Sequence, residues 1–350
     1  METKHIKIKD LISQASDMED AADLIRSGEV VAFPTETVYG LGADGLNEEA
    51  VKKIFQAKGR PQDNPLILHV DSLEMLKRLI VEIPKDAYLC MDKFWPGPLT
   101  ILFKRTHIVP GIITAGLDTV AIRMPSHPIA LELIKKSNTP IAAPSANTSG
   151  RPSPTRASHV IQDMDGKIAM IIDGGETGVG LESTVLDLTE DVPMILRPGG
   201  VTLEDLREFL PQVIIDPGLL EGTGDHVTPK SPGQKYRHYA PKALMILFSG
   251  DGDKVVGEIL ERARKDEAEG KKVGLLVTEE NQHRYPEKNI VVMGSSMDKN
   301  TIAHGLFDAI RKLDEMDVDI ILCESVEEDQ IGMAIMNRLF KAAGGNRIYL

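Results

Sequence analysis

The sequence FPTETVYGLG at residues 33–42 is followed closely by Lys58-Gly59-Arg60-Pro61 and by Asn64-Pro65-Leu66. An apolar strand is expected to stop at Pro34, so the first motif reads as a turn of small residues at a strand end. Lys58 and Arg60 are expected in a loop just past a helix end. There Arg offers a planar fork, and Lys a point charge, to phosphate oxygens. We interpret the combination as a pocket for a phosphate-bearing ligand.

The alternative interpretation of Lys58 and Arg60 is a pair of solvated surface cations. Pro61 and Asn64-Pro65 favour the pocket, because they fix the loop and a fixed loop positions side chains better than a flexible one. A second candidate loop of small hydroxyl and amide residues runs from Ala143 to Ser153, after a short apolar strand. It is suited to binding phosphate or nucleotide oxygens, with an ordinary polar turn as the alternative.

Two further motifs carry weaker signals. Phe94 to Thr100 holds the chain's one Trp beside two prolines, and we interpret it as a packing corner. Residues 174–184 are rich in glycine, which would let the backbone approach a ligand, although a simple hairpin is the alternative. Ser183 and Thr184, which open the next strand, are better placed to contact a bound amino acid.

The motifs sit in a chain of 350 residues, long enough for two domains. Residues 1–210 mix strands and helices without a strict βαβ rhythm, which predicts a twisted, mixed sheet with helices. Residues 211–241 show no clear periodicity and read as a linker. Strands and helices alternate in residues 242–350, which predicts a smaller Rossmann-like parallel α/β domain. Its first turn, at residues 249–252, lacks the G-x-G-x-x-G fingerprint of a dinucleotide site.

Local signals place two helices near the first motif. Residues 17–27 are expected to be helical, with Ser16 as N-cap and Glu19 completing a capping box. Asn47 is expected to cap a helix from Glu48 to about Ala57, with residues 51, 54 and 55 on one apolar face.

Composition narrows the function classes. The formal net charge is −13, which disfavours a tight nucleic-acid binder, because neutralising phosphates takes many Lys and Arg residues. No apolar run is long enough to span a membrane, and the N-terminus lacks an apolar signal core. Two cysteines cannot form a disulfide framework and suit a reducing cytoplasm. No zinc spacing, G-x-S-x-G elbow or P-loop occurs.

Taken together, the motifs resemble the YrdC-like family, in its long two-domain form, the threonylcarbamoyl-AMP synthases. The resemblance covers essentially the whole chain, and its motifs in the first domain are specific. Further segments that carry it are Arg123-Met124-Pro125, Glu182-Ser183-Thr184-Val185 and residues 231–241 of the linker. It implies that L-threonine, bicarbonate or CO2, and ATP give L-threonylcarbamoyl-AMP and pyrophosphate. The product would serve the N6-threonylcarbamoyl modification of adenosine beside the tRNA anticodon.

The resemblance also assigns residues. Lys58 and Arg60 are implied as the catalytic, charge-neutralising pair. L-threonine is implied to contact Thr37, His69, Arg123, Ala143 and Ser183. ATP is implied to contact Arg60, Asn64, Thr119, Ser145, Asn147, Ser153, Arg197 and the linker residue Tyr236. Mg2+ is expected with ATP, without confident protein ligands. The linker segment 221–240 is expected to lie over the active-site mouth as a lid.

Two alternatives stay open. One is an RNA-binding module of the YrdC-like fold without synthase activity, which the acidic balance disfavours. The other is a carbamoyl-transfer domain like those of hydrogenase maturation proteins, whose extra zinc-finger and acyl-phosphatase-like segments we do not find in the sequence. The expected partner is a downstream tRNA threonylcarbamoyl transferase complex, with weak or no direct tRNA binding and no membrane association.

Overall fold

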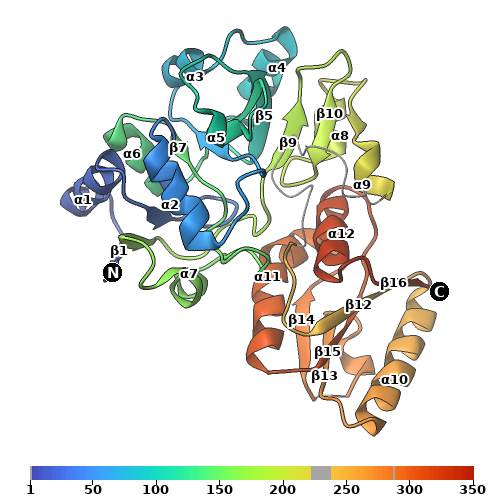
Figure 1. The fold of residues 1–350 in the computed structure, drawn as a ribbon. Helices are drawn as coiled ribbons and strands as arrows, with labels where there is room; N and C mark the ends of the chain where they lie inside the picture. Colours follow the sequence, from blue (N-terminus) through green and yellow to red (C-terminus); the bar gives the residue numbers. More distant parts are fainter. Residues whose placement is uncertain (1, 222–237, 287) are drawn as a thin grey trace. The chain divides into compact units, whose positions relative to one another are not determined.

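The computed structural model describes residues 2–221, 238–286 and 288–350. The chain divides into two units (Figure 1). The first comprises residues 1–149, 153–178 and 182–236, and the second comprises residues 150–152, 179–181 and 237–350. Each unit has its own sheet. No helix among the described residues is both long and apolar enough to cross a membrane.

The first unit is built on an eleven-stranded sheet in the order β1-β8-β2-β3-β7-β4-β6-β5-β9-β10-β11. The sheet contains both parallel and antiparallel pairs, such as the antiparallel pair β2–β3 and the parallel pair β4–β6. The expected mixed sheet is therefore confirmed. Its strands are β1 Lys4–Lys7, β2 Val31–Phe33, β3 Gly40–Asp44, β4 Ile67–His69, β5 Leu99–Lys104, β6 Thr119–Arg123, β7 Ile141–Ala142, β8 Met170–Asp173, β9 Thr184–Asp187, β10 Met194–Arg197 and β11 Ile214–Ile215.

Nine helices accompany this sheet among the residues the structure describes. They are α1 Ala15–Arg26, α2 Glu48–Lys58, α3 Leu73–Leu79, α4 Lys85–Phe94, α5 Gly111–Thr114, α6 Pro128–Ser137, α7 Ala157–Met164, α8 Leu203–Arg207 and α9 Pro217–Glu221. The capping box predicted for the first helix is wrong. α1 begins earlier, with Gln14 at the N-cap and no side-chain capping bond, because the Gln14 side chain bonds Lys9 N and Lys7 O instead.

Helix α2 follows its sequence signals closely. The Asn47 side chain accepts from Glu49 N and Ala50 N, so the predicted cap is confirmed. Val51, Ile54 and Phe55 are buried, as the spacing predicts. The helix ends because Gly59 adopts φ 62° and ψ 37°, a left-handed conformation that glycine reaches at little cost.

The sequence predicts a turn for the first motif, but its last residues belong to a strand. Residues 40–44 form β3, which pairs with β2 on one side and β7 on the other. A Cβ on Gly42 would lie 2.6 Å from Phe33 Cε1 and 2.8 Å from Ile141 Cγ2. Glycine therefore lets both neighbouring side chains pack against β3. This packing overrides the low strand propensity of the sequence GLGAD.

The second unit contains a five-stranded parallel sheet in the order β14-β13-β15-β12-β16. The predicted Rossmann-like domain is confirmed. Its elements are β12 Leu244–Ser249, α10 Gly252–Ala268, β13 Val273–Thr278, the 3₁₀ helix η1 Gln282–Arg284, β14 Ile290–Gly294, α11 Lys299–Glu315, β15 Ile320–Glu324, α12 Ile331–Ala342 and β16 Arg347–Tyr349.

Helices cover both faces of this parallel sheet. α10 packs on β12, β13 and β15, whereas α11 packs on β13, β14 and α12. Figure 1 draws α10 and α11 on opposite sides of the strands. The apolar residues Val255, Ile259 and Ala263 give α10 a continuous buried face.

The stretch interpreted as a linker begins with regular structure. Ile214–Ile215 forms β11, which pairs in parallel with β10, and Pro217–Glu221 forms α9. Periodicity missed both elements because a two-residue strand and a five-residue helix are too short to show any. Residues 222–237 lie outside the described residues. Tyr236 and most of the segment expected to act as a lid fall among them.

Candidate active site

The candidate site lies where neighbouring strands of the first sheet end. In the β4–β6 pair, His69 and Arg123 are register partners, and Arg123 is also opposite Thr100 of β5. The Thr100 hydroxyl lies 2.8 Å from that of Ser183, which immediately precedes β9. Parallel and antiparallel pairing therefore brings His69, Arg123 and Ser183 to one region of the sheet, although they are far apart in sequence.

Arg123 is the centre of this region. Its side chain is 4% exposed. Nε donates to Gly97 O at 3.2 Å, and Nη1 donates to Thr37 Oγ1 at 2.9 Å. Nη2 forms an ion pair with Glu36 Oε1 at 2.6 Å. The guanidinium is thus held by residues of the first motif, and its planar fork suits a ligand carboxylate.

The two titratable groups beside Arg123 respond differently to burial. Burial raises the pKa of Glu36, but the positive charge of Arg123 and hydrogen bonds outweigh it and leave that pKa below its usual range. Burial, together with Arg123, lowers the pKa of His69 to about 3. Glu36 is therefore an anion and His69 a neutral imidazole near pH 7. Among the described residues, His69 Nδ1 has no hydrogen-bond partner.

Lys58 does not lie in a loop, as the sequence suggested, but is the last residue of α2 and only 2% exposed. Its ammonium donates to Asn147 O at 2.6 Å and to Ser145 O. The helix face that buries Ile54 and Phe55 carries Lys58 inward with it. Lys58 therefore joins α2 to the second candidate loop.

The second candidate loop is bound to the first motif through the backbone. Leu41 N donates to Pro144 O at 2.7 Å, and Ala146 N donates to Tyr39 O at 2.8 Å. The Ser145 hydroxyl donates to Asn147 Oδ1 at 2.5 Å. Ala143, which directly follows β7, is buried and donates its N–H to Ile67 O at 3.1 Å. The two motifs therefore form one continuous wall.

The residues expected to contact ATP come from separate segments of the first unit. Arg60 donates to Pro65 O at 3.1 Å, next to the buried Asn64. Within the described ranges, Asn64 Oδ1 has no hydrogen-bond partner. Arg197, at the end of β10, donates to Ser183 O at 2.9 and 3.0 Å. Thr119 begins β6, and so stands at the opposite end of that strand from Arg123.

Sequence reasoning gave no role to two carboxylates of the site. Glu36 pairs with Arg123, and the buried Glu182 accepts from the Ser153 hydroxyl at 2.5 Å. Both occur inside motifs that the sequence singled out, but the pairing joins positions 87 and 29 residues apart. No local pattern could reveal it.

The chemistry of the site follows from its charges. Lys58, Arg123 and Arg197 are all at most 5% exposed. Buried cations of this kind suit anionic carboxylate and phosphate groups. Among the residues that the structure describes, no cluster of three or more His, Cys, Asp or Glu side chains could hold a metal ion.

Known proteins match the chain along most of its length. The family model Sua5_yciO_yrdC, described as telomere recombination, matches residues 23–199. A model described as the C-terminal domain of threonylcarbamoyl-AMP synthase matches residues 201–344. The threonylcarbamoyl-AMP synthase of Pyrococcus abyssi is 53% identical over 93% of each chain. That of Bacillus subtilis is 49% identical, over 94% of this chain and 93% of its own.

A solved structure is similar over both units. The crystal structure of P. abyssi Sua5 complexed with L-threonine matches with a TM-score of 0.93 and 48% identity, covering all of both chains.

Proposed function

The chain belongs to the Sua5/YciO/YrdC family of threonylcarbamoyl-AMP synthases, and from this membership we propose how its residues carry out the reaction. The enzyme is an ATP-using transferase that converts L-threonine, bicarbonate or CO2, and ATP into L-threonylcarbamoyl-AMP and pyrophosphate. The alternative of an RNA-binding module without synthase activity is not favoured.

Two steps account for the product. The amine of threonine adds to CO2 with loss of a proton, or to bicarbonate with loss of water, and gives an N-carboxylate. An oxygen of this carboxylate then attacks the α-phosphorus of ATP, and the bond to pyrophosphate breaks. Such a transfer depends mainly on positioning and on neutralising phosphate charge.

Threonine is assigned to the Arg123 side of the site. The guanidinium binds the threonine carboxylate, while Thr37 and Glu36 hold the guanidinium in place. His69 is uncharged near pH 7, so it offers threonine a hydrogen bond without repelling the amine or attracting a phosphate. Ser183 and the backbone of Ala143 complete this part of the site.

ATP is assigned to the polar groups around the second candidate loop. The expected nucleotide contacts are Arg60, Asn64, Thr119, Ser145, Asn147, Ser153, Arg197 and Tyr236. Lys58, the last residue of α2, donates to the backbone of the loop that carries Ser145 and Asn147 and neutralises charge where the new bond forms. Mg2+ enters with the triphosphate, held by phosphate oxygens and water rather than by a protein cage.

The product is a mixed anhydride, so it must pass quickly to an acceptor before water destroys it. A tRNA threonylcarbamoyl transferase complex is the expected recipient, and the enzyme itself needs little tRNA affinity. The reaction belongs to the cytoplasm, where ATP and tRNA meet.

The observation that carries the assignment is the buried Arg123 guanidinium beside the neutral His69. The test is pyrophosphate release by the purified chain with ATP, threonine and bicarbonate. Release must require threonine, and Arg123→Lys should raise the KM for threonine at least tenfold, because the bidentate geometry is lost. Arg105→Lys is a matched control, since Arg105 also donates to backbone carbonyls, those of Leu117 and Val109 between β5 and β6, but has no assigned substrate contact. Release without threonine, or none with all substrates, contradicts the assignment.

A further inference from the structure

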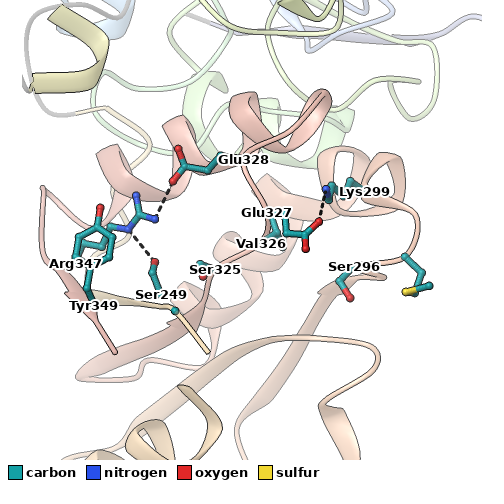
Figure 2. Close-up of a pocket in the computed structure, with 11 residues that line it drawn as sticks. Ser249, Ser296, Lys299, Ser325, Val326, Glu327, Glu328, Arg347 and Tyr349 are labelled. Atoms are coloured by element: carbon teal, nitrogen blue, oxygen red, sulfur yellow. Dashed lines mark hydrogen bonds and ion pairs between the residues drawn. The ribbon is translucent and has the colours of Figure 1, made fainter. Parts of the chain in front are cut away.

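A pocket of about 550 Å³ lies in the second unit, at the edge where its parallel strands end. Its lining comes from residues that end or follow β12, β14 and β15, and from β16. Figure 2 shows Arg347, Tyr349 and Ser249 on one side of it and Lys299 and Ser296 on the other. The volume lies within the ordinary range for small-molecule sites. None of the substrate contacts assigned above belongs to this pocket.

The pocket lies at a position in the parallel sheet where α/β proteins commonly bind ligands. From β12 the chain crosses through α10 to β13, toward the β14 edge, whereas from β15 it crosses through α12 to β16, at the other edge. Right-handed crossovers in opposite directions place their helices on opposite faces and leave a crevice between the adjacent strands β12 and β15. Ser249 and Ser325 lie at this crevice.

The two cations of the pocket are much less exposed than the carboxylates that pair with them. Lys299 and Arg347 are only 14% and 17% exposed in their side chains. Their carboxylate partners come from the loop after β15 and are far more exposed, Glu327 at 86% and Glu328 at 48%. The distance is 3.5 Å from Lys299 Nζ to Glu327 Oε2 and 2.8 Å from Arg347 Nη2 to Glu328 Oε1. Asp329 also pairs with Lys299.

Ion pairs with such exposed carboxylates contribute little stability. A bound anion can therefore replace the loop carboxylates at both cations without a large loss. The carboxylates stand where the anionic groups of a ligand would bind, which makes the loop an internal substitute for that ligand.

The Arg347 end also offers a flat surface. Arg347 Nε donates to the buried Ser249 hydroxyl at 2.8 Å, which fixes the guanidinium. The guanidinium carbon lies 4.4 Å from the ring centroid of Tyr349, whose residue is 70% exposed. An exposed aromatic ring backed by a fixed arginine is a surface on which a nucleobase stacks.

The span sets the size of the ligand. Arg347 lies on the edge strand β16, whereas the Lys299 ammonium pairs with the loop after the central strand β15, two strand spacings or roughly 10 Å away. Inorganic phosphate cannot contact both ends, whereas a nucleoside with a chain of phosphates can. We propose that this pocket binds a nucleoside polyphosphate, with its base on Tyr349 beside Arg347 and its phosphates reaching Lys299. The Ser325 hydroxyl lines the path between them.

The test is equilibrium dialysis of the full chain with labelled ATP in the absence of threonine. We expect a class of bound ATP that survives Arg60→Ala but is lost, at least tenfold in affinity, in the double variant Lys299→Gln/Arg347→Gln. Threonine-dependent pyrophosphate release should stay unchanged in that double variant. Lys312→Gln is the control, because Lys312 lies on the same helix and pairs with Asp308 outside the pocket.

Two further variants separate charge from folding defects. Glu327→Gln/Glu328→Gln removes two of the three competing carboxylates, leaving Asp329, and should tighten ATP binding by about two- to fivefold, the reverse of an ordinary loss of contacts. Ser325→Phe fills the pocket without touching a charge and should abolish this binding. Adenosine alone and inorganic phosphate alone should each bind more weakly than ATP. ATP binding that none of these variants alters would overturn the proposal.

Discussion

Glu36 and Arg123 form a buried ion pair, with 2.6 Å between Glu36 Oε1 and Arg123 Nη2. Thr37, the next residue along from Glu36, accepts from Nη1 of the same guanidinium. One turn of the first motif thus fixes the group assigned to bind threonine.

Removing the acid of this pair should destabilise the enzyme. Glu36→Ala leaves the Arg123 charge buried without its partner, and the free energy of unfolding should fall by about 3 to 5 kcal/mol at pH 7. Because the folded state lowers the pKa of Glu36, its stabilisation is full above the usual glutamate pKa and is lost as pH falls through the lowered value. Thermal unfolding from pH 3 to 7 should therefore show a weaker acid dependence in the variant.

The matched control is Glu29→Ala. Glu29 also pairs with a cation, Lys53, at 2.7 Å, but on the surface. Its removal should change stability by about 1 kcal/mol or less. If Glu36→Ala and Glu29→Ala lower the free energy of unfolding equally, burial does not strengthen the Glu36 pair.

His69 should make the fold acid-sensitive in a second pH range. Its pKa is about 3 when folded and near 6.5 when unfolded. The unfolded chain therefore binds the extra proton, and stability is full above pH 6.5 and falls as pH drops toward 3. The loss over that range should be on the order of 3 to 5 kcal/mol. Denaturant unfolding at several pH values measures it, and His69→Asn should remove this part.

The histidine prediction has an internal comparison. His5 is exposed and pairs with Asp165 at the surface. His5→Gln removes only this exposed pair and should change the free energy of unfolding at pH 7 by about 1 kcal/mol or less. A wild-type curve that is flat between pH 4 and 6.5 would mean that His69 is protonated in the folded enzyme.

Lys58→Ala should affect both activity and stability. The substitution leaves the carbonyls of Ser145 and Asn147 without the donor that Lys58 supplies, and each such buried acceptor costs about 1 to 3 kcal/mol. Pyrophosphate release should be lost, and the unfolding temperature should drop by several degrees. Lys53→Ala, on the same helix but half exposed, should do neither. If Lys58→Ala keeps the stability of the wild type, the buried contacts of Lys58 do not form in the enzyme.

Two glycines should respond to alanine with opposite signs. Gly42→Ala forces a methyl group against Phe33 and Ile141 and should cost about 1 to 3 kcal/mol. Gly257 lies inside α10 with open space around its Cα, so Gly257→Ala should stabilise by up to about 1 kcal/mol through helix propensity. Urea unfolding of both variants is the measurement, and the same sign for both would contradict this account.

The sequence predicted what depends on neighbours along the chain. Asn47 caps α2 as predicted, the helix ends at Lys58, one residue past the predicted end, and Val51, Ile54 and Phe55 are buried as expected. Convergence across strands could not be predicted in the same way. β3 forms because Gly42 admits side chains from two other strands, and Lys58 is buried because carbonyls 87 and 89 residues away accept its protons. Such pairings depend on the register of distant segments, which no local periodicity records.

The pairing of β1 with β8 has a consequence for synthesis. Lys4–Lys7 pairs in parallel with Met170–Asp173, so the first strand is made some 166 residues before its partner is complete. At about 5 to 20 residues per second, it waits on the order of 10 to 30 s on the ribosome. The sequence Lys-His-Ile-Lys keeps that waiting strand charged at both ends. A nascent strand of this composition is a poor template for pairing with neighbouring chains, so its charges protect the enzyme before its active site exists.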